Sequence, residues 1–181
     1  PFYILFGGMY LPTRPTYDPK LPWVADPADQ AAWDRAVKVR KALNLAVDKE
    51  KIFNTILGGR GVLTAVPMML PFQLGYNPNW KQYPYDPEGA KKLLAEAGYP
   101  NGFPITVRMF TLPGREQIKD IGEALGMYFS NVGLKVTLEN VDYTGVQAPD
   151  QRERKLKSVG AYAIFYPEAI SAWSLTARSA S

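Results

Sequence analysis

The sequence predicts an α/β fold in which a mixed sheet is flanked by helices. Two alternating segments, residues 105–111 and 134–141, enclose a helical pattern over 116–131. This order is typical of a strand-helix-strand crossover with parallel strands. Apolar, aromatic-rich segments at 2–10 and 161–166 add two further buried strands.

The opening segment, residues 2–10, is rich in aromatic and β-branched residues and is the longest apolar run. Gly7 and Gly8 interrupt it, and it is far shorter than the roughly 18 residues that span a bilayer. A signal-peptide core is the alternative, but no basic leader or small-residue cleavage pattern accompanies it, which favours a buried strand. Because residue 1 is Pro, we expect a fragment of a longer polypeptide.

Prolines follow the opening strand closely, at positions 12, 15, 19 and 22. They forbid a helix and a central strand, so we expect an extended surface arm. Acidic capping residues then predict the starts of three helices. These are Asp26 or Asp29, Asp48 and Asp86.

Residues 60–85 contain four prolines and show neither helical nor strand periodicity, which predicts a long apolar loop packed on the body. Further on, Asp142 is predicted to cap a helix that leads into the charged run 151–157. Because Glu153 interrupts that basic run, a solvated helix face is favoured over a phosphate contact, and we expect no nucleic-acid partner.

Composition excludes several classes of site. The chain has 181 residues, of which 46% are apolar, enough for one domain or one lobe of a larger protein. It contains no Cys and no His, which removes disulfides, the Ser-His-Asp triad and the commonest zinc ligand. The net charge of +4 attracts few partners. We expect neither a metal nor a cofactor.

Two motifs invite a catalytic interpretation. The glycine cluster at 57–61 lacks the ending of a phosphate loop and follows a helix, so it is interpreted as a helix stop. The carboxylates lie mainly at predicted helix starts, where the helix dipole favours them, although a general acid and base among them stays conceivable.

The aromatic residues mostly indicate core packing, with one exception. A strand that ends in Phe165 and Tyr166 and continues into Glu168 places rings and a carboxylate at the edge of a sheet, where α/β folds usually hold ligands.

Two segments carry a family resemblance. VRKALNLAVDKEKI, at residues 39–52, and PYDPEGAKKLLAEAGYPNGF, at 84–103, occur in that order and spacing. Both resemble signatures of the family 5 solute-binding proteins of ATP-driven importers of peptides, nickel and related solutes. The resemblance extends from about Phe2 to Trp173.

The resemblance implies a periplasmic-binding-protein-like lobe that is incomplete in this chain. Residues 1–35 would be a crossover strand and proline-rich arm, and 36–181 part of the C-terminal lobe of a two-lobe protein. The two matching helical segments would be scaffold, and solute contacts would come from the hinge strand and from loops after the strands. Arg108 or Arg115 would receive a solute carboxylate, with a surface role as the alternative for each. The implied solute-binding set is Phe6, Thr111, Arg115, Tyr143, Tyr166, Glu168 and Trp173.

The implied function is a periplasmic or extracellular receptor, with a lipid anchor in the complete protein left open. It would bind a small solute, with peptide as the leading class. Its partners would be a membrane permease and the missing N-terminal lobe of the same polypeptide. FYPEAISAW at residues 165–173 departs from the tryptophan and aspartate-proline pattern of peptide-binding relatives. The alternative is a free-standing α/β enzyme domain with an active site at the strand edge.

Overall fold

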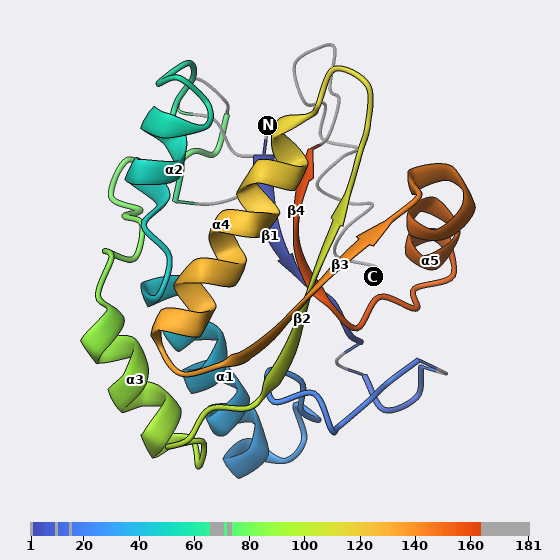
Figure 1. The fold of residues 1–181 in the computed structure, drawn as a ribbon. Coiled ribbons are helices and arrows are strands. Elements are labelled where there is room, and N and C mark those ends of the chain that lie inside the picture. Colours follow the sequence, from blue (N-terminus) through green and yellow to red (C-terminus); the bar gives the residue numbers. More distant parts are fainter. Residues whose placement is uncertain (1, 10, 15, 66–70, 72–73, 164–181) are drawn as a thin grey trace.

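The computed structural model describes residues 2–9, 11–14, 16–65, 71 and 74–163, with the side chains of 161–163 left out (Figure 1). Within these residues no helix is long and apolar enough to cross a bilayer. Of the strand expected over residues 161–166, residues 164–166 lie outside them.

The sheet has four strands in the order β1-β4-β2-β3. Their bounds are Phe2–Phe6 for β1, Pro104–Phe110 for β2, Lys135–Val141 for β3 and Val159–Ala163 for β4. Strand β2 runs parallel to β3 and β4, whereas β1 is antiparallel to β4. The predicted mixed sheet is confirmed.

Strand β1 ends at Phe6, four residues earlier than expected, because of the glycines that follow it. A Cβ on Gly7 would meet the Ser158 carbonyl oxygen at 2.7 Å, and Gly8 has a φ of +112°. Only glycine accepts both the close backbone approach and the positive φ without strain.

Three helices begin at the predicted acidic caps. Helix α1 (Gln30–Leu45) is capped by Asp29, α2 (Lys49–Thr55) by Asp48 and α3 (Pro87–Glu96) by Asp86. Each carboxylate accepts a hydrogen bond from a backbone N–H of the first turn, which satisfies one of the donors that a helix start leaves open. Residue 35, where we expected the arm to give way to the lobe, falls within α1.

Helix α4 (Gln117–Asn131) joins β2 to β3 and covers one face of the sheet. Ile105 and Val107 of β2 share a buried cluster with Leu125 and Phe129 of α4. Gly122 allows this close approach, because a Cβ there would meet Met109 Cγ at 2.3 Å. Leu138 of β3 lies against Gly126 of α4, where a Cβ would meet its Cδ2 at 2.7 Å, although the Leu138 side chain is 48% exposed.

The proline-rich arm ends in the core, which corrects the expectation of a surface arm. Trp23 is 1% exposed, and its Nε1 donates a hydrogen bond of 2.6 Å to the Gly7 carbonyl oxygen. Arg40 of α1 donates to the Trp23 carbonyl oxygen at 2.7 Å. The arm is therefore fastened both to the end of β1 and to α1.

The segment between α2 and α3 differs from the expected loop packed on the body. In its described residues Val62 is 61% exposed, Leu74 100% and Tyr83 50%. It contains no helix or strand where it is described.

After β3 the chain forms a π-helical turn, η1 (Tyr143–Gln147), and then the short helix α5 (Ala148–Arg152). Asp142 caps η1, as predicted, by accepting from the Gly145 N–H. The helix ends at Arg152, so most of the charged run 151–157 is not helical, and Arg154 has a φ of +58°.

Candidate functional site

The carboxyl ends of β2, β3 and β4 meet at one edge of the sheet because these strands are parallel. The last pair of the β2 and β3 ladder joins Phe110 to Val141. Phe2 of β1 pairs with Ala163, the last residue of β4, at the same edge. We call this rim of the sheet the carboxyl edge. Thr111 follows β2 directly and is exposed there.

Tyr143 follows β3 at the same edge. Its ring lies 5.3 Å from that of Phe110, with the planes tilted by 38°. Tyr143 is half-buried and belongs with Leu112 and Val141 to an apolar cluster around Phe110. The structure therefore brings Thr111 and Tyr143, two of the predicted solute contacts, to one place.

Arg115 lies in the turn between β2 and α4, near Thr111 in sequence. Its Nη1 donates to the Gly114 carbonyl oxygen at 2.6 Å, and Glu116 accepts from the Gly114 N–H at 2.9 Å. The side chain is half-buried. Its role toward a solute carboxylate stays a prediction.

Phe6 lies away from the carboxyl edge. It pairs with Val159 at the start of β4, and Val159 pairs with Val107 in the middle of β2. At about 3.3 Å per residue, Phe6 is roughly 13 Å along β1 from Phe2. The structure does not bring Phe6 together with Thr111 and Tyr143. Tyr166, Glu168 and Trp173 lie outside the described residues, so their contacts stay predictions.

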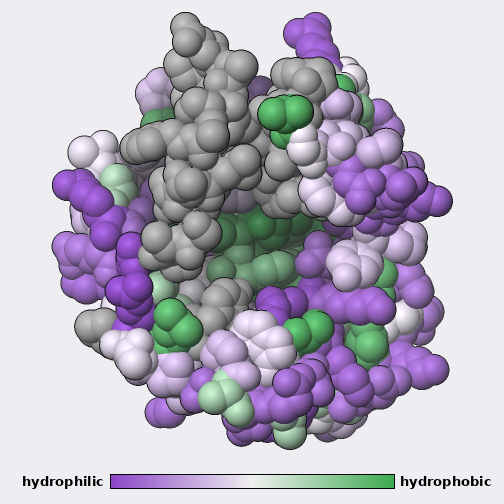
Figure 2. Space-filling view, turned by 180° about the vertical axis from the view of Figure 1, so that it is seen from behind, coloured by the Kyte–Doolittle hydropathy of each residue, from purple (hydrophilic) through white to green (hydrophobic). Residues whose placement is uncertain are grey.

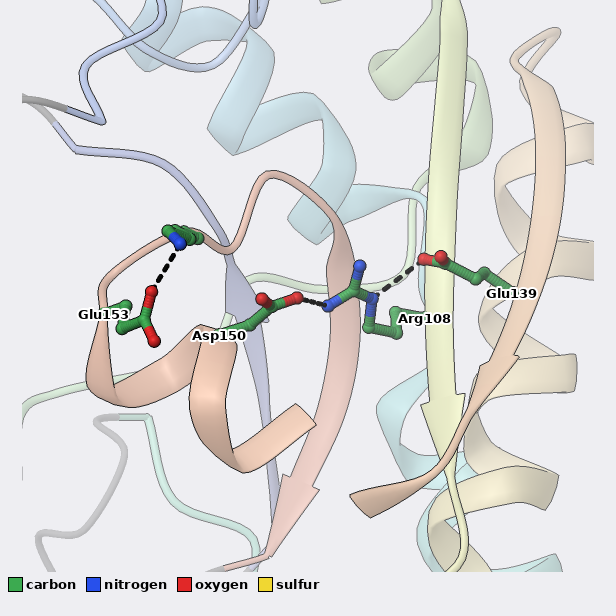
Figure 3. Close-up of polar contacts among 5 residues, drawn as sticks. Arg108, Glu139, Asp150 and Glu153 are labelled. Atoms are coloured by element: carbon green, nitrogen blue, oxygen red, sulfur yellow. Dashed lines mark hydrogen bonds and ion pairs between the residues drawn. The ribbon is translucent and has the colours of Figure 1, made fainter. Parts of the chain in front are cut away.

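Arg108 of β2 joins β3 to α5 on the face opposite α4 (Figure 3). Its Nε donates to Glu139 at 2.8 Å and its Nη1 to Asp150 at 2.5 Å. Burial disfavours the guanidinium charge, but these hydrogen bonds and the two negative charges outweigh it and raise the pKa of Arg108. Arg108 was one of the two candidates to receive a solute carboxylate, but its guanidinium already pairs with Glu139 and Asp150.

These partners of Arg108 were not predicted. Successive side chains of a strand point to opposite faces of the sheet, so Arg108 lies on the other face from its buried neighbour Val107. The pattern therefore indicates only that Arg108 faces away from α4. Glu139 and Asp150 become neighbours through the register of β3 and the turn at η1, which no local pattern in the sequence specifies.

Four of the described aspartates serve as helix caps: Asp29, Asp48, Asp86 and Asp142. No cluster of three or more acidic groups able to hold a metal ion occurs in the part of the chain that the structure describes. Seen from behind (Figure 2), the molecule shows hydrophobic surface near the centre of this face.

Comparison with known proteins decides the family. The model of the bacterial extracellular solute-binding proteins, family 5, matches residues 10–179. The chain belongs to this family. The predicted resemblance and the lobe-like fold class are therefore confirmed.

Individual relatives agree with this assignment. Heme-binding protein A of Haemophilus influenzae is 39% identical over 126 residues, which cover 67% of this chain and 23% of that protein. The glutathione-binding protein GsiB of Pectobacterium atrosepticum is 30% identical over 143 residues, which cover 79% of this chain and 26% of that protein. The family 5 chain therefore spans about a quarter of the length of these curated relatives.

Among solved structures, the chain is similar to the periplasmic binding protein DppA of Helicobacter pylori, an ABC-transporter-associated protein in complex with the peptide STSA. The TM-score is 0.61 at 25% identity, with 72% of this chain and 25% of that chain covered. These relatives are named as binding proteins.

Proposed function

We propose that the complete protein is an extracytoplasmic receptor that delivers peptides or similar small solutes to an ATP-driven importer. The chain would contribute part of one lobe, with residues 36–181 in the C-terminal lobe and residues 1–35 as crossover strand and arm. The family match over residues 10–179 carries this proposal. Its partners would be a membrane permease and the N-terminal lobe of the same polypeptide, and it would act in the periplasm or outside the cell.

The geometry of the carboxyl edge supports the proposal. Thr111 is exposed, Tyr143 presents a half-buried ring, and Phe110 and Val141 form an apolar floor beside them. Such a surface contributes contacts to a solute from one side. Because a solute that touches both lobes stabilises their closed arrangement, a second lobe is needed to complete the site.

The alternative of a free-standing enzyme domain is less well supported. Catalysis at this edge would require a converging acid and base, and the described carboxylates near it, Asp142 and Glu116, accept hydrogen bonds from backbone N–H groups. The sequence has neither His nor Cys to take their place.

The test is calorimetric titration of the complete protein with peptides and with any solute that copurifies with it. We expect Tyr143→Ala to weaken binding about tenfold, which corresponds to about 1.4 kcal/mol, whereas Lys119→Ala on the outer face of α4 leaves it unchanged. Tyr166, Glu168 and Trp173 are tested in the same way. Unaltered affinity in all four site variants would remove the site from this edge.

A further inference from the structure

The segment that follows β3 turns back over the face of the sheet opposite α4. At its start the Tyr143 ring lies 5.3 Å from the Phe110 ring, and at its end Asp150 accepts a hydrogen bond from Arg108. Phe110 and Arg108 are two residues apart in β2, so their side chains share one face of the sheet. The segment 143–150 is therefore fastened to the same strand at both ends.

The two attachments lie on neighbouring pairs of the β2 and β3 ladder. Arg108 pairs with Glu139, and Phe110 pairs with Val141. At about 3.3 Å per residue, these pairs are roughly 7 Å apart along the strands. The pair of Arg108 is ionic and holds α5, whereas the pair of Phe110 is apolar and holds Tyr143.

The turn between the attachments has an uncommon conformation. In η1 the Gln147 N–H donates to the Asp142 carbonyl oxygen at 3.0 Å, and the Gly145 N–H donates to the Asp142 carboxylate at 2.5 Å. Turns of the π type are rare and occur frequently at functional sites. A sparsely populated conformation persists where the contacts around it determine it. We therefore expect the shape of η1 to depend on its attachments to the sheet.

Of the two attachments, the ion pair is the stronger. The side chain of Arg108 is 15% exposed and that of Asp150 is 26% exposed, so water and salt screen their attraction only weakly. Hydrogen bonds between charged partners are roughly twice as strong as those between neutral ones. Because Tyr143 is the first residue of η1, the contact between Arg108 and Asp150 also determines where the Tyr143 ring is held.

We propose that Arg108 and Asp150 are positioning residues for solute binding, because their ion pair holds η1 so that the Tyr143 ring stays in place at the carboxyl edge. Neither residue has to touch the solute. The inference rests on the proposed function in taking Tyr143 as a solute contact. Glu139 has a different role, since it binds the same guanidinium from β3 and not from η1 or α5.

Two variants of the complete protein separate positioning from stability. Asp150→Ala and Glu139→Ala each remove one carboxylate from Arg108 and leave the other, but only Asp150→Ala detaches α5. Both are titrated calorimetrically with glutathione and with the peptide STSA, probes chosen from the relatives named above. We expect Asp150→Ala to weaken binding about fivefold and Glu139→Ala by less than about twofold, since only the former disturbs a preorganised contact.

A conservative variant adds a rescue. Asp150→Glu keeps a carboxylate that the guanidinium can bind, so the affinity should lie within about threefold of the wild type. Equal losses of affinity in Asp150→Ala and Glu139→Ala would overturn the proposal, because a general loss of stability would then explain both. An unchanged affinity in Asp150→Ala would overturn it as well.

The double variant of Asp150→Ala and Tyr143→Ala shows whether Asp150 acts through the ring. If it does, removing Asp150 costs nothing further once Tyr143 is gone, and the double variant binds within about twofold of Tyr143→Ala alone. Losses that multiply to about fiftyfold would show that Asp150 acts on the solute by another route, which contradicts the proposal.

Hydrogen exchange without solute tests the placement of η1 directly. The Gly145 and Gln147 amides, which bond to Asp142, should exchange at least about tenfold faster in Asp150→Ala and less than about twofold faster in Glu139→Ala. Amides of α4 report the change in global stability of each variant. Unchanged exchange at η1, or equal acceleration at η1 and α4, would overturn the proposal.

These outcomes keep the two proposals apart. If Tyr143→Ala weakens binding and Asp150→Ala does not, the positioning role fails and the proposed solute site stands. If the wild type binds neither probe, or Tyr143→Ala binds as tightly as the wild type, the result counts against the proposed site. Exchange at η1 then still decides whether Asp150 holds the turn.

Discussion

Arg108 of β2 and Asp150 of α5 are 42 residues apart in sequence, yet their side chains meet at 2.5 Å on the face of the sheet opposite α4. Through this contact the segment that carries Tyr143 is fastened to the central strands. The same guanidinium also binds Glu139 of β3, and its side chain is 15% exposed. The three residues fix the position of η1 and α5 against the sheet.

The first prediction concerns this ion group. Arg108→Met leaves two partly buried carboxylates without their shared cation, so the free energy of unfolding of the complete protein should fall by about 2 to 3 kcal/mol. Denaturant unfolding measures the change. Glu123→Gln, which removes the 52% exposed partner of Lys119, is the control and should change stability by less than about 0.5 kcal/mol. Equal effects in the two variants would contradict the structural role of Arg108.

The second prediction concerns Trp23. Trp23→Ala empties a fully buried site and removes the hydrogen bond to Gly7, and we expect a loss of about 3 to 5 kcal/mol in the free energy of unfolding. Trp33→Phe, a smaller change at a half-buried ring that lies 4.6 Å from the Arg40 guanidinium, should lose less than about 1 kcal/mol. Thermal unfolding followed by calorimetry compares the variants. A loss below that of Trp33→Phe would show that the arm is not anchored in the core.

The third prediction concerns Ser158, which is 4% exposed and whose Oγ has no hydrogen-bond partner among the residues that the structure describes. Because Ser158→Ala removes a buried hydroxyl without breaking a hydrogen bond, stability should stay constant or rise by up to about 1 kcal/mol. Chemical denaturation measures it. A loss of more than about 1 kcal/mol would indicate that the hydroxyl has a partner, such as a bound water.

The fourth prediction concerns pH. Lys157 donates to Asp18 at 2.8 Å and joins the arm to the segment before β4. This hydrogen bond, with help from the Lys20 N–H, holds the pKa of Asp18 below its usual 3.8. Since the folded-state pKa is the lower one, the stabilisation is present above pH 3.8 and disappears as the pH falls through the folded-state value.

The measurement is unfolding of wild type and Asp18→Asn across the acidic range. The wild type should exceed the variant by less than about 1 kcal/mol at neutral pH, because Lys157 is exposed and water screens the pair. The difference should vanish toward low pH. A difference that grows as the pH falls would contradict the assignment.

Much of the fold was predictable because its signals are local. Asp48 and Asp86 mark helix starts through their own hydrogen bonds, and the alternating residues of β2 and β3 on either side of α4 determine a parallel pair. The inward turn at Trp23 depends on the distant Gly7 and Arg40. Leu138 lies against Gly126 of α4, yet it is 48% exposed because β3 is the last strand of the sheet, so its exposure depends on strand order and not on the alternating pattern.

The candidate site was predictable only in part, for the same reason. Thr111 and Tyr143 follow two parallel strands, so their meeting at one edge comes from topology. Phe6 was placed in the solute-binding set by resemblance, but the antiparallel register of β1 with β4 puts it at the level of Val107 in mid-sheet. The partners of Arg108 depend on the turn at η1, which the sequence pattern does not specify.

The central claim is that this chain forms part of one lobe of a receptor that closes around a solute. Small-angle X-ray scattering of the complete protein, before and after adding the solute that copurifies with it, tests this claim most directly. The account predicts that the radius of gyration falls when the solute binds, since contacts to both lobes stabilise the closed form. Saturating binding with an unchanged radius of gyration would contradict it.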